Sequence, residues 1–367
     1  KEIFTYGGDY GRYPGSDYNF NCNGIIAPNR RLNPHAYEIQ YYLQNVWIKN
    51  FDAANGAISI YNENFFKNID DLKLSAAIYA NGVKLSTLEI PGTKGIAPQA
   101  TKLVKSDALK AAVAQAEHAG EEIAVNFAFA SDGSQPLVDK GQVMARQQFV
   151  VNAYKFDKVD TPAQAAAPAN KKAKVQQADN IEVEETNSYV KVSAERMSVT
   201  IGKKTGMIDY LDVDGEPMLK FRESMTPEFW RAPTDNDYGA SLQKKMRVWK
   251  NPQMNLKSFD KSESKDSVVL TANFEMPEVK AELMLRYRIN AAGEVAVTEK
   301  MTTDKEAKVA DLFRYGMQLQ MPASFSKLEY YGRGPEENYI DRHSSSFIGK
   351  YEANVKDEYY PYVRPQE

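Results

Sequence analysis

The stretch 72-LKLSAAIYANGVKL-85 decides the fold of the first half of the chain. Its larger apolar residues alternate with polar or small ones, which is the period of a β-strand with one buried face. The Asn81-Gly82 pair interrupts this alternation. Such a pair favours a tight hairpin turn, because both of its residues tolerate a positive φ. The stretch therefore predicts two antiparallel strands joined directly to each other.

Similar short runs flank this hairpin and predict further strands. They are 57-AISIYNENFF-66, 122-EIAVNFAF-129 and 142-QVMARQQFVVNAY-154. Turn-forming residues separate them, and residues 106–120 between them predict an inserted helix. The number and spacing of the strands indicate an antiparallel β-sandwich of immunoglobulin type over residues 46–155.

A second all-β region follows a segment without core-forming residues. Residues 156–180 are rich in Ala, Pro, Lys and Gln, which indicates a linker. Alternating runs then begin at 189-YVKVSAERMSVTIG-202 and continue through residue 301. We therefore expect a mainly β protein in which residues 181–367 belong to a large antiparallel β-sandwich.

Residues 1–45 do not suffice for a domain of their own. Gly, Pro, Asp and Ser crowd residues 6–17 and favour turns. Residues 33–47 have helical spacing, with Asn33 as the expected N-cap and Pro34 at the first helical position.

Composition excludes several classes of protein. The length of 367 residues argues for several domains. The formal net charge of -3 argues against a non-specific nucleic-acid binder. No run approaches the ~18 consecutive apolar residues of a membrane-spanning helix, so we expect a soluble protein. The single cysteine, Cys22, excludes an internal disulfide framework but leaves the cytoplasm and the periplasm both open. The three histidines show no zinc-binding spacing.

Polar side chains and amides gather in 16-SDYNFNCNGIIAPNRRLNPHAYEI-39. Asn19, Phe20, Asn21 and Asn23 place carboxamide and main-chain oxygens close together, and hard cations and sugar hydroxyls bind such groups. The alternative is a loop whose amides bond to its own backbone. Composition alone favours the loop.

Two further clusters allow a chemical and a structural interpretation. Asp235, Asn236 and Asp237 offer oxygen ligands to a cation, but they equally suit a turn rich in Asp and Asn next to Trp230, and we favour the turn. Residues 330–352 contain Glu336, Glu337 and Asp341. Adjacent carboxylates rarely face one target, so we do not expect acid–base catalysis there.

Three separated motifs resemble one family. They are 6-YGGDYG-11 with residues 16–39, 229-FWRAPTDNDYG-239, and 330-YYGRGPEENYIDR-342 with 362-YVRPQE-367. In this order they resemble the C-terminal portion of large bacterial β-galactosidases of glycoside hydrolase family 2. The resemblance implies that residues 1–45 are a remnant of the catalytic (β/α)8 barrel, residues 46–155 the second immunoglobulin-like domain, and residues 181–367 the truncated start of the terminal sandwich.

The resemblance also implies a function for the first motif. In this family two glutamates hydrolyse terminal β-galactosides with retention of configuration, and neither matches a position in this chain. Phe20, through its main-chain oxygen, and Asn23, through its side-chain oxygen, would bind sodium beside the sugar, and the Phe20 ring would line the galactose subsite. The complete enzyme would use sodium and magnesium and form a homo-oligomer, whereas residues 1–367 alone would be inactive and hold only part of the sodium site.

Two alternatives remain open from the sequence. One is a non-catalytic module whose β-sandwiches bind glycans or serve as a scaffold. The other keeps glycoside hydrolase family 2 but changes the substrate to another β-glycoside. The barrel remnant argues against a free-standing module, because such a module has no need of a barrel's last loop.

Overall fold

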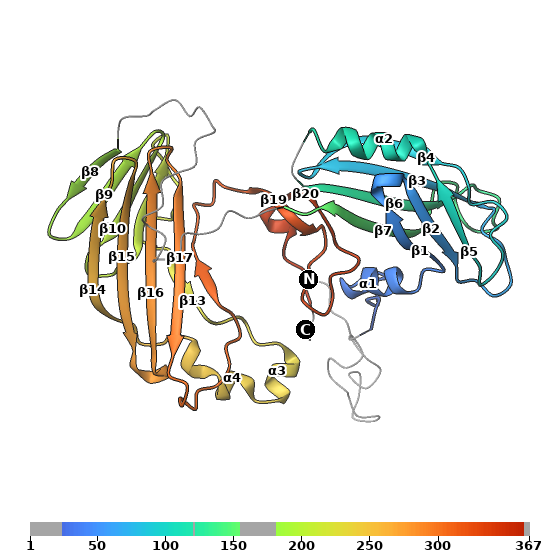
Figure 1. The fold of residues 1–367 in the computed structure, drawn as a ribbon. Coiled ribbons are helices and arrows are strands. Elements are labelled where there is room, and N and C mark those ends of the chain that lie inside the picture. Colours follow the sequence, from blue (N-terminus) through green and yellow to red (C-terminus); the bar gives the residue numbers. More distant parts are fainter. Residues whose placement is uncertain (1–23, 120–121, 155–180, 363–367) are drawn as a thin grey trace, which may run out of the picture. The chain divides into compact units, whose positions relative to one another are not determined.

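A computed structural model describes residues 24–119, 122–154 and 181–362 (Figure 1). These residues are mainly β, and their sheets are antiparallel. They divide into two compact units. The first unit combines the N-terminal part of the described chain with residues 327–360, and the second holds the described residues between 181 and 326. The expected mainly β, sandwich-type fold is confirmed.

The first unit is a β-sandwich. One sheet has the strand order β1-β2-β5 and the other has the order β4-β3-β6-β7. The strands are β1 (Val46–Asp52), β2 (Ala57–Asn62), β3 (Leu72–Ala80), β4 (Val83–Ile90), β5 (Thr101–Lys105), β6 (Ile123–Ser131) and β7 (Val143–Asn152).

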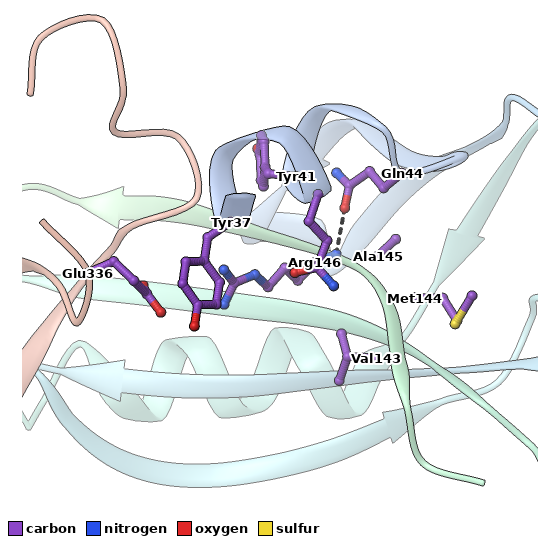
Figure 2. A pocket seen from close by; sticks show the side chains of 9 residues that line it. Tyr37, Tyr41, Gln44, Val143, Met144, Ala145, Arg146 and Glu336 are labelled. Carbon is purple, nitrogen blue, oxygen red and sulfur yellow. Dashed lines mark hydrogen bonds between the residues drawn. The ribbon is translucent and has the colours of Figure 1, made fainter. Parts of the chain in front are cut away.

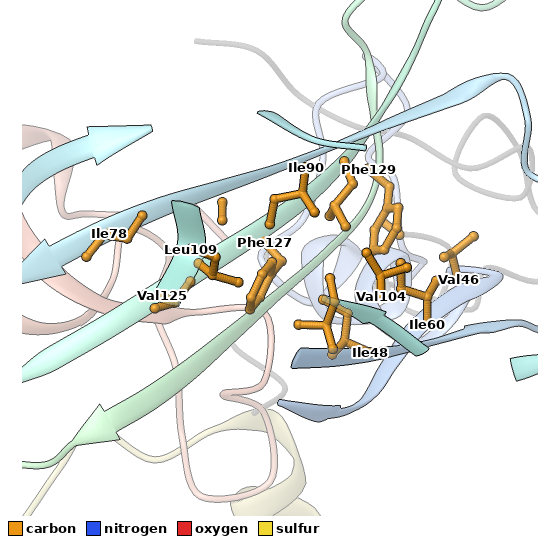
Figure 3. Packing of buried hydrophobic residues seen from close by; sticks show 14 of the residues in the cluster. Val46, Ile48, Ile60, Ile78, Ile90, Val104, Leu109, Val125, Phe127 and Phe129 are labelled. Carbon is orange, nitrogen blue, oxygen red and sulfur yellow. The ribbon is translucent and has the colours of Figure 1, made fainter. Parts of the chain in front are cut away.

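Apolar side chains of both sheets fill the space between them (Figure 3). Along β3 every second residue is buried, as the alternation in the sequence predicts. Ile58 and Ile60 of β2 meet Phe127 of β6 in this core, and all three are fully buried. The Ig-like strand plan stays a prediction, but two sheets around one core are present.

The expected turn and the expected inserted helix are both present. Asn81 and Gly82 join β3 to β4 with φ values of 47° and 75°, the left-handed region that such a turn requires. Helix α2 (Asp107–Ala116) begins after Ser106, whose side chain accepts a hydrogen bond from the backbone N–H of Leu109 at 3.2 Å. Leu109 and Val113 of this helix are buried in the sandwich core.

A hairpin from far along the sequence completes the first unit. Strands β19 (Lys327–Gly334) and β20 (Phe347–Asn354) pair with each other, and the short 3-10 helix η6 (Val355–Asp357) follows. The Tyr331 ring of β19 packs on Gly82, where a Cβ would lie 2.6 Å from the ring. By their contacts these residues belong to the first compact unit. The assignment of residues 181–367 to the terminal sandwich, which the family resemblance implies, stays a prediction.

The second unit holds a five-stranded sheet of order β12-β11-β10-β9-β8, a four-stranded sheet of order β14-β15-β16-β17, and the pair β13-β18. Its strands are β8 (Ile181–Glu185), β9 (Tyr189–Ala194), β10 (Met197–Gly202), β11 (Ile208–Val213), β12 (Glu216–Pro217), β13 (Thr226–Glu228), β14 (Asn255–Glu263), β15 (Ser267–Met276), β16 (Ala281–Asn290), β17 (Val295–Thr303) and β18 (Gly316–Gln318). Its helical segments are α3 (Asp235–Gly239), α4 (Leu242–Lys245), η4 (Arg247–Trp249) and η5 (Pro277–Val279).

Tyr287 links the two larger sheets of the second unit. It is fully buried on β16, and its hydroxyl donates a hydrogen bond of 2.9 Å to the carbonyl of Gly206. Gly206 has a φ of 68°, and a Cβ there would lie 2.7 Å from the Phe274 ring. The tight turn before β11 therefore needs glycine both for its backbone and for its packing.

Candidate functional site

The two predicted ligand residues, Phe20 and Asn23, lie outside the described residues, so their sodium and sugar contacts stay a prediction. The described chain starts at the next residue, Gly24. What the structure does describe is how the chain directly after the predicted ligands is held.

Residues 24–33 form a small closed loop. Ile26 and Leu32 pair as a β-bridge, and the Ala27 N–H donates to the Arg31 carbonyl at 2.8 Å. Asn33 closes the loop with its side-chain amide, which donates to the Gly24 carbonyl at 2.5 Å. Asn33 is buried. The backbone next to Asn23 is thus fixed by a residue ten positions further along.

Tyr360 supports this loop from the far end of the first unit. Its hydroxyl donates to the Asn33 side-chain oxygen at 2.5 Å and lies 3.3 Å from the Leu32 carbonyl. The Arg31 guanidinium lies over the Tyr360 ring, 4.7 Å from its centre. A guanidinium over an aromatic face is an attractive arrangement. Tyr360 therefore contacts this loop through its hydroxyl, at Asn33 and Leu32, and through its ring, at Arg31.

Helix α1 (His35–Tyr42) begins where this loop ends. The helix was expected, but the expected N-cap is wrong, because Pro34 occupies that position and Asn33 uses its side chain to close the loop. The helix presents the carboxylate of Glu38 to residues 335–346, which we call the 335–346 loop. The Glu38 carboxylate accepts hydrogen bonds from the backbone N–H groups of Ser344 at 3.0 Å and Ser345 at 2.8 Å.

These hydrogen bonds set the charge state of Glu38. Partial burial acts to raise its pKa, but the hydrogen bonds from Ser345 and Ser344 outweigh burial and hold the pKa below the ordinary value. Glu38 is therefore ionised at neutral pH. A charged acceptor makes stronger hydrogen bonds than a neutral one, so it ties the 335–346 loop firmly to the helix.

Strand β7 binds the same end of the 335–346 loop and the start of β20. The Gln148 amide makes two hydrogen bonds of 2.8 Å with the backbone of Ile348, one as donor and one as acceptor. Arg146 donates to the Ser345 carbonyl at 3.1 Å, and its guanidinium lies 5.2 Å from the centre of the Phe347 ring. The polar side chains of β7 thereby bind backbone groups at the start of β20 and just before it.

Glu122 fixes the hairpin at the opposite end of the sheet. It is 6% exposed, and its carboxylate accepts a hydrogen bond of 2.6 Å from the Tyr331 hydroxyl and one of 3.1 Å from the Tyr154 N–H. Burial and the bond to Glu122 raise the pKa of Tyr331 well above its ordinary value, so the tyrosine stays a donor. Buried polar side chains with partners on both sides favour a single arrangement of the hairpin.

Residues of helix α1 and strand β7, with Glu336, line an open pocket of about 220 Å³ (Figure 2). Its walls carry aromatic rings, amides, one guanidinium and one carboxylate. The lining residues are Tyr37, Gln40, Tyr41, Gln44, Val143, Met144, Ala145, Arg146 and Glu336. Gln44 is 4% exposed, and its side-chain oxygen accepts a hydrogen bond of 2.8 Å from the backbone N–H of Arg146. Sequence reasoning missed this pocket, because Gln44, Arg146 and Glu336 carry no local pattern that brings them together.

Within the cluster Asp235–Asp237, Asp237 has a structural role at the start of helix α3. The Thr234 side chain accepts from the Asp237 N–H, and the Asp237 carboxylate accepts from the Thr234 N–H at 2.8 Å. This reciprocal pair is a capping box at the start of α3. Asp237 also forms a salt bridge of 2.5 Å with Arg231. Its carboxylate is therefore occupied by the protein itself.

No group of three or more His, Cys, Asp or Glu side chains within the described ranges is arranged to hold a metal ion. Within the 335–346 loop, Glu337 pairs with Arg342 at 2.9 Å, while Glu336 turns to the pocket. The adjacent carboxylates of Glu336 and Glu337 therefore do not face a common target. In the part of the chain that the structure describes, no helix has the length and apolar character needed to cross a membrane.

Two family models match parts of this chain. Residues 193–367 match the family model described as "Beta galactosidase small chain", and residues 58–152 match "Beta-galactosidase, domain 4". A protein of Priestia megaterium named beta-galactosidase is 25% identical over 99% of this chain and 33% of its own length. One of the same name from Streptococcus thermophilus is 28% identical over 100% of this chain and 33% of its own length. The chain thus spans about a third of the curated relatives that it matches.

Proposed function

We infer that this chain is the C-terminal part of a retaining enzyme that hydrolyses terminal β-D-galactosides. Its matches fit a portion of a large β-galactosidase. The observation that carries this proposal is the match of the whole chain, in order, to proteins named beta-galactosidase. Retaining glycosidases need two carboxyl groups about 5–5.5 Å apart. We propose that this pair lies in the parent enzyme outside residues 1–367.

The chain itself would contribute to substrate binding. Phe20 and Asn23 would give two neutral oxygen ligands to sodium, with the sugar next to the ion and to the Phe20 ring. Neutral carbonyl oxygens suit a monovalent cation. The bond from Asn33 to Gly24 and the bond from Tyr360 to Asn33 support this proposal, since they hold the backbone that directly follows Asn23.

The activity of the parent enzyme and of this chain tests the proposal. We expect the longer protein that contains this chain to hydrolyse a chromogenic β-galactoside in sodium buffer and to release the β-anomer first, as nuclear magnetic resonance detects. The chain alone should show no turnover. A longer protein that prefers another β-glycoside would contradict the substrate, and turnover by residues 1–367 would place the carboxyl pair within them.

Replacing Asn23 by alanine in the longer protein should weaken its activation by sodium. Removing one of two neutral ligands in this chain should raise the sodium concentration for half-maximal activity by about 10-fold, or ~1.4 kcal/mol. The control is Asn21→Ala, since the family resemblance gives Asn21 no role as a ligand. Equal sodium dependence in both variants would show that Asn23 is not a ligand.

A further inference from the structure

We propose that Tyr360 is a positioning residue for substrate binding, because it holds the segment that follows the predicted ligands Phe20 and Asn23. This segment, residues 24–42, runs from the first described residue to the end of α1, and we call it the N-terminal arm. The proposal rests on the proposed function in one step, the assignment of the two ligands to the sugar subsite. Its structural part concerns described residues of the first unit alone.

The apolar core of the sandwich does not hold the N-terminal arm. That core begins at Val46, and no described residue between 24 and 45 belongs to it. The larger apolar side chains Ile26, Leu32 and Leu43 are exposed. A segment that buries little apolar surface opens easily, so its position depends on specific polar contacts.

Residues 335–360 supply such contacts at two points of the N-terminal arm. At α1, the Glu38 carboxylate binds the backbone N–H groups of Ser344 and Ser345. At the loop that precedes α1, the contact comes from Tyr360. The second contact lies closer in sequence to the predicted ligands, so it has the more direct effect on their backbone.

Tyr360 acts on this loop through the side-chain amide of Asn33. The Gly24 carbonyl can only accept a hydrogen bond, so the amide must turn its nitrogen to Gly24 and its oxygen to the Tyr360 hydroxyl, which donates to it. The backbone N–H of Asn33 donates to the Ile25 carbonyl at 3.0 Å. One buried residue thus binds the two carbonyls that come directly after Asn23, and Tyr360 satisfies its oxygen.

The backbone at Gly24 limits where Asn23 and Phe20 can lie. A loop that is already held in its binding conformation loses less entropy when the ligand binds. Without the Tyr360 hydroxyl, the oxygen of buried Asn33 loses its donor, so the loop opens more often. The expected result is weaker substrate binding with unchanged chemistry, that is, a higher KM at the same kcat.

The first test is hydrogen exchange on the whole chain 1–367, read by mass spectrometry of peptides that cover residues 24–33. Tyr360→Phe removes the hydroxyl but keeps the ring against which Arg31 lies. The amides of Ala27 and Asn33, which donate within the loop, should exchange about 2- to 10-fold faster, as expected for the loss of one hydrogen bond. Peptides from β3 should keep their exchange rates.

The matched control is Tyr359→Phe, because Tyr359 is the adjacent tyrosine and is 76% exposed. It should exchange as the unchanged chain does. Asn33→Asp is a second variant, which keeps an acceptor for Tyr360 but places an oxygen against the Gly24 carbonyl. It should speed exchange in the loop more than Tyr360→Phe does. If Asn33→Asp does not fold, Tyr360→Phe still decides the test.

The second test measures KM and kcat of the longer protein for a chromogenic β-galactoside at constant sodium. Tyr360→Phe should raise KM about 2- to 10-fold without changing kcat, whereas Tyr359→Phe should change neither. Equal exchange in the two tyrosine variants overturns the proposal, and so does faster exchange without a rise in KM. A longer protein that does not hydrolyse β-galactosides overturns the proposed function instead, and with it the substrate role of Tyr360.

Discussion

Phe127→Ala is expected to destabilise the first unit by about 3–5 kcal/mol, the usual cost of removing a buried phenylalanine. Phe127 is fully buried between the two sheets. Its ring meets Phe51 and Phe149 edge to face at 5.1 and 5.9 Å between ring centres, so the substitution removes two aromatic contacts and leaves a cavity. Urea denaturation followed by circular dichroism would measure the loss.

Phe66→Ala is the matched control for this experiment. Phe66 is 98% exposed in the same unit, so the same substitution removes no buried surface. We expect its effect to stay within about 0.5 kcal/mol. Similar unfolding midpoints for the two variants would mean that Phe127 does not lie in the core of the sandwich.

Glu299→Gln is expected to stabilise the second unit at pH 8 but not at pH 4.5. Glu299 lies on β17, and burial raises its pKa from 4.5 to about 7. Its Oε1 atom has no hydrogen-bond partner among the described residues. The ionised form is therefore the costly one. Burial raises the pKa values of Tyr287 and Tyr315, and the nearby charge of Glu299 adds to both shifts.

The direction of the pH dependence follows from this shift. Because the folded state binds the proton more tightly than the unfolded state, the contribution to stability is complete below pH 4.5 and is lost as the pH rises through 7. The shift corresponds to at most roughly 3 kcal/mol, and we expect about 2 kcal/mol because the carboxyl is only half buried. Urea midpoints at the two pH values, with Glu306→Gln at an exposed position as control, would measure it. A Glu299→Gln variant with the same pH dependence as the unchanged chain would contradict the assignment.

The features that the sequence predicted correctly are those set by neighbouring residues. The alternation in β3 and the Asn81-Gly82 turn follow from backbone preferences over a few residues. The same holds for α2, with its cap at Ser106. The predicted N-cap of α1 is wrong because the Asn33 side-chain oxygen, which would accept a capping bond, accepts from the Tyr360 hydroxyl instead, a partner that sequence position alone does not indicate.

The candidate site depends on contacts between distant residues, and these leave no local pattern. Glu38 and Ser345 are 307 positions apart, and Tyr360 and Asn33 are 327 apart. Neither contact could be inferred from spacing. A structural interpretation of Asp235–Asp237 was available from the sequence because a turn rich in Asp and Asn is a local feature, but the capping box of Thr234 and Asp237 was not predicted. Phe20 and Asn23 rest on the family resemblance and stay a prediction.

The first unit is assembled from two stretches of chain with the second unit between them, and this affects how it folds during synthesis. Gln148 leaves the ribosome 200 residues before its partner Ile348. At about 5–20 residues per second, this delay is roughly 10–40 s. During that time the sandwich has its core but lacks the hairpin that covers β7 and Glu122. Chaperones that bind nascent chains would therefore find this face open while residues 181–326 are being made.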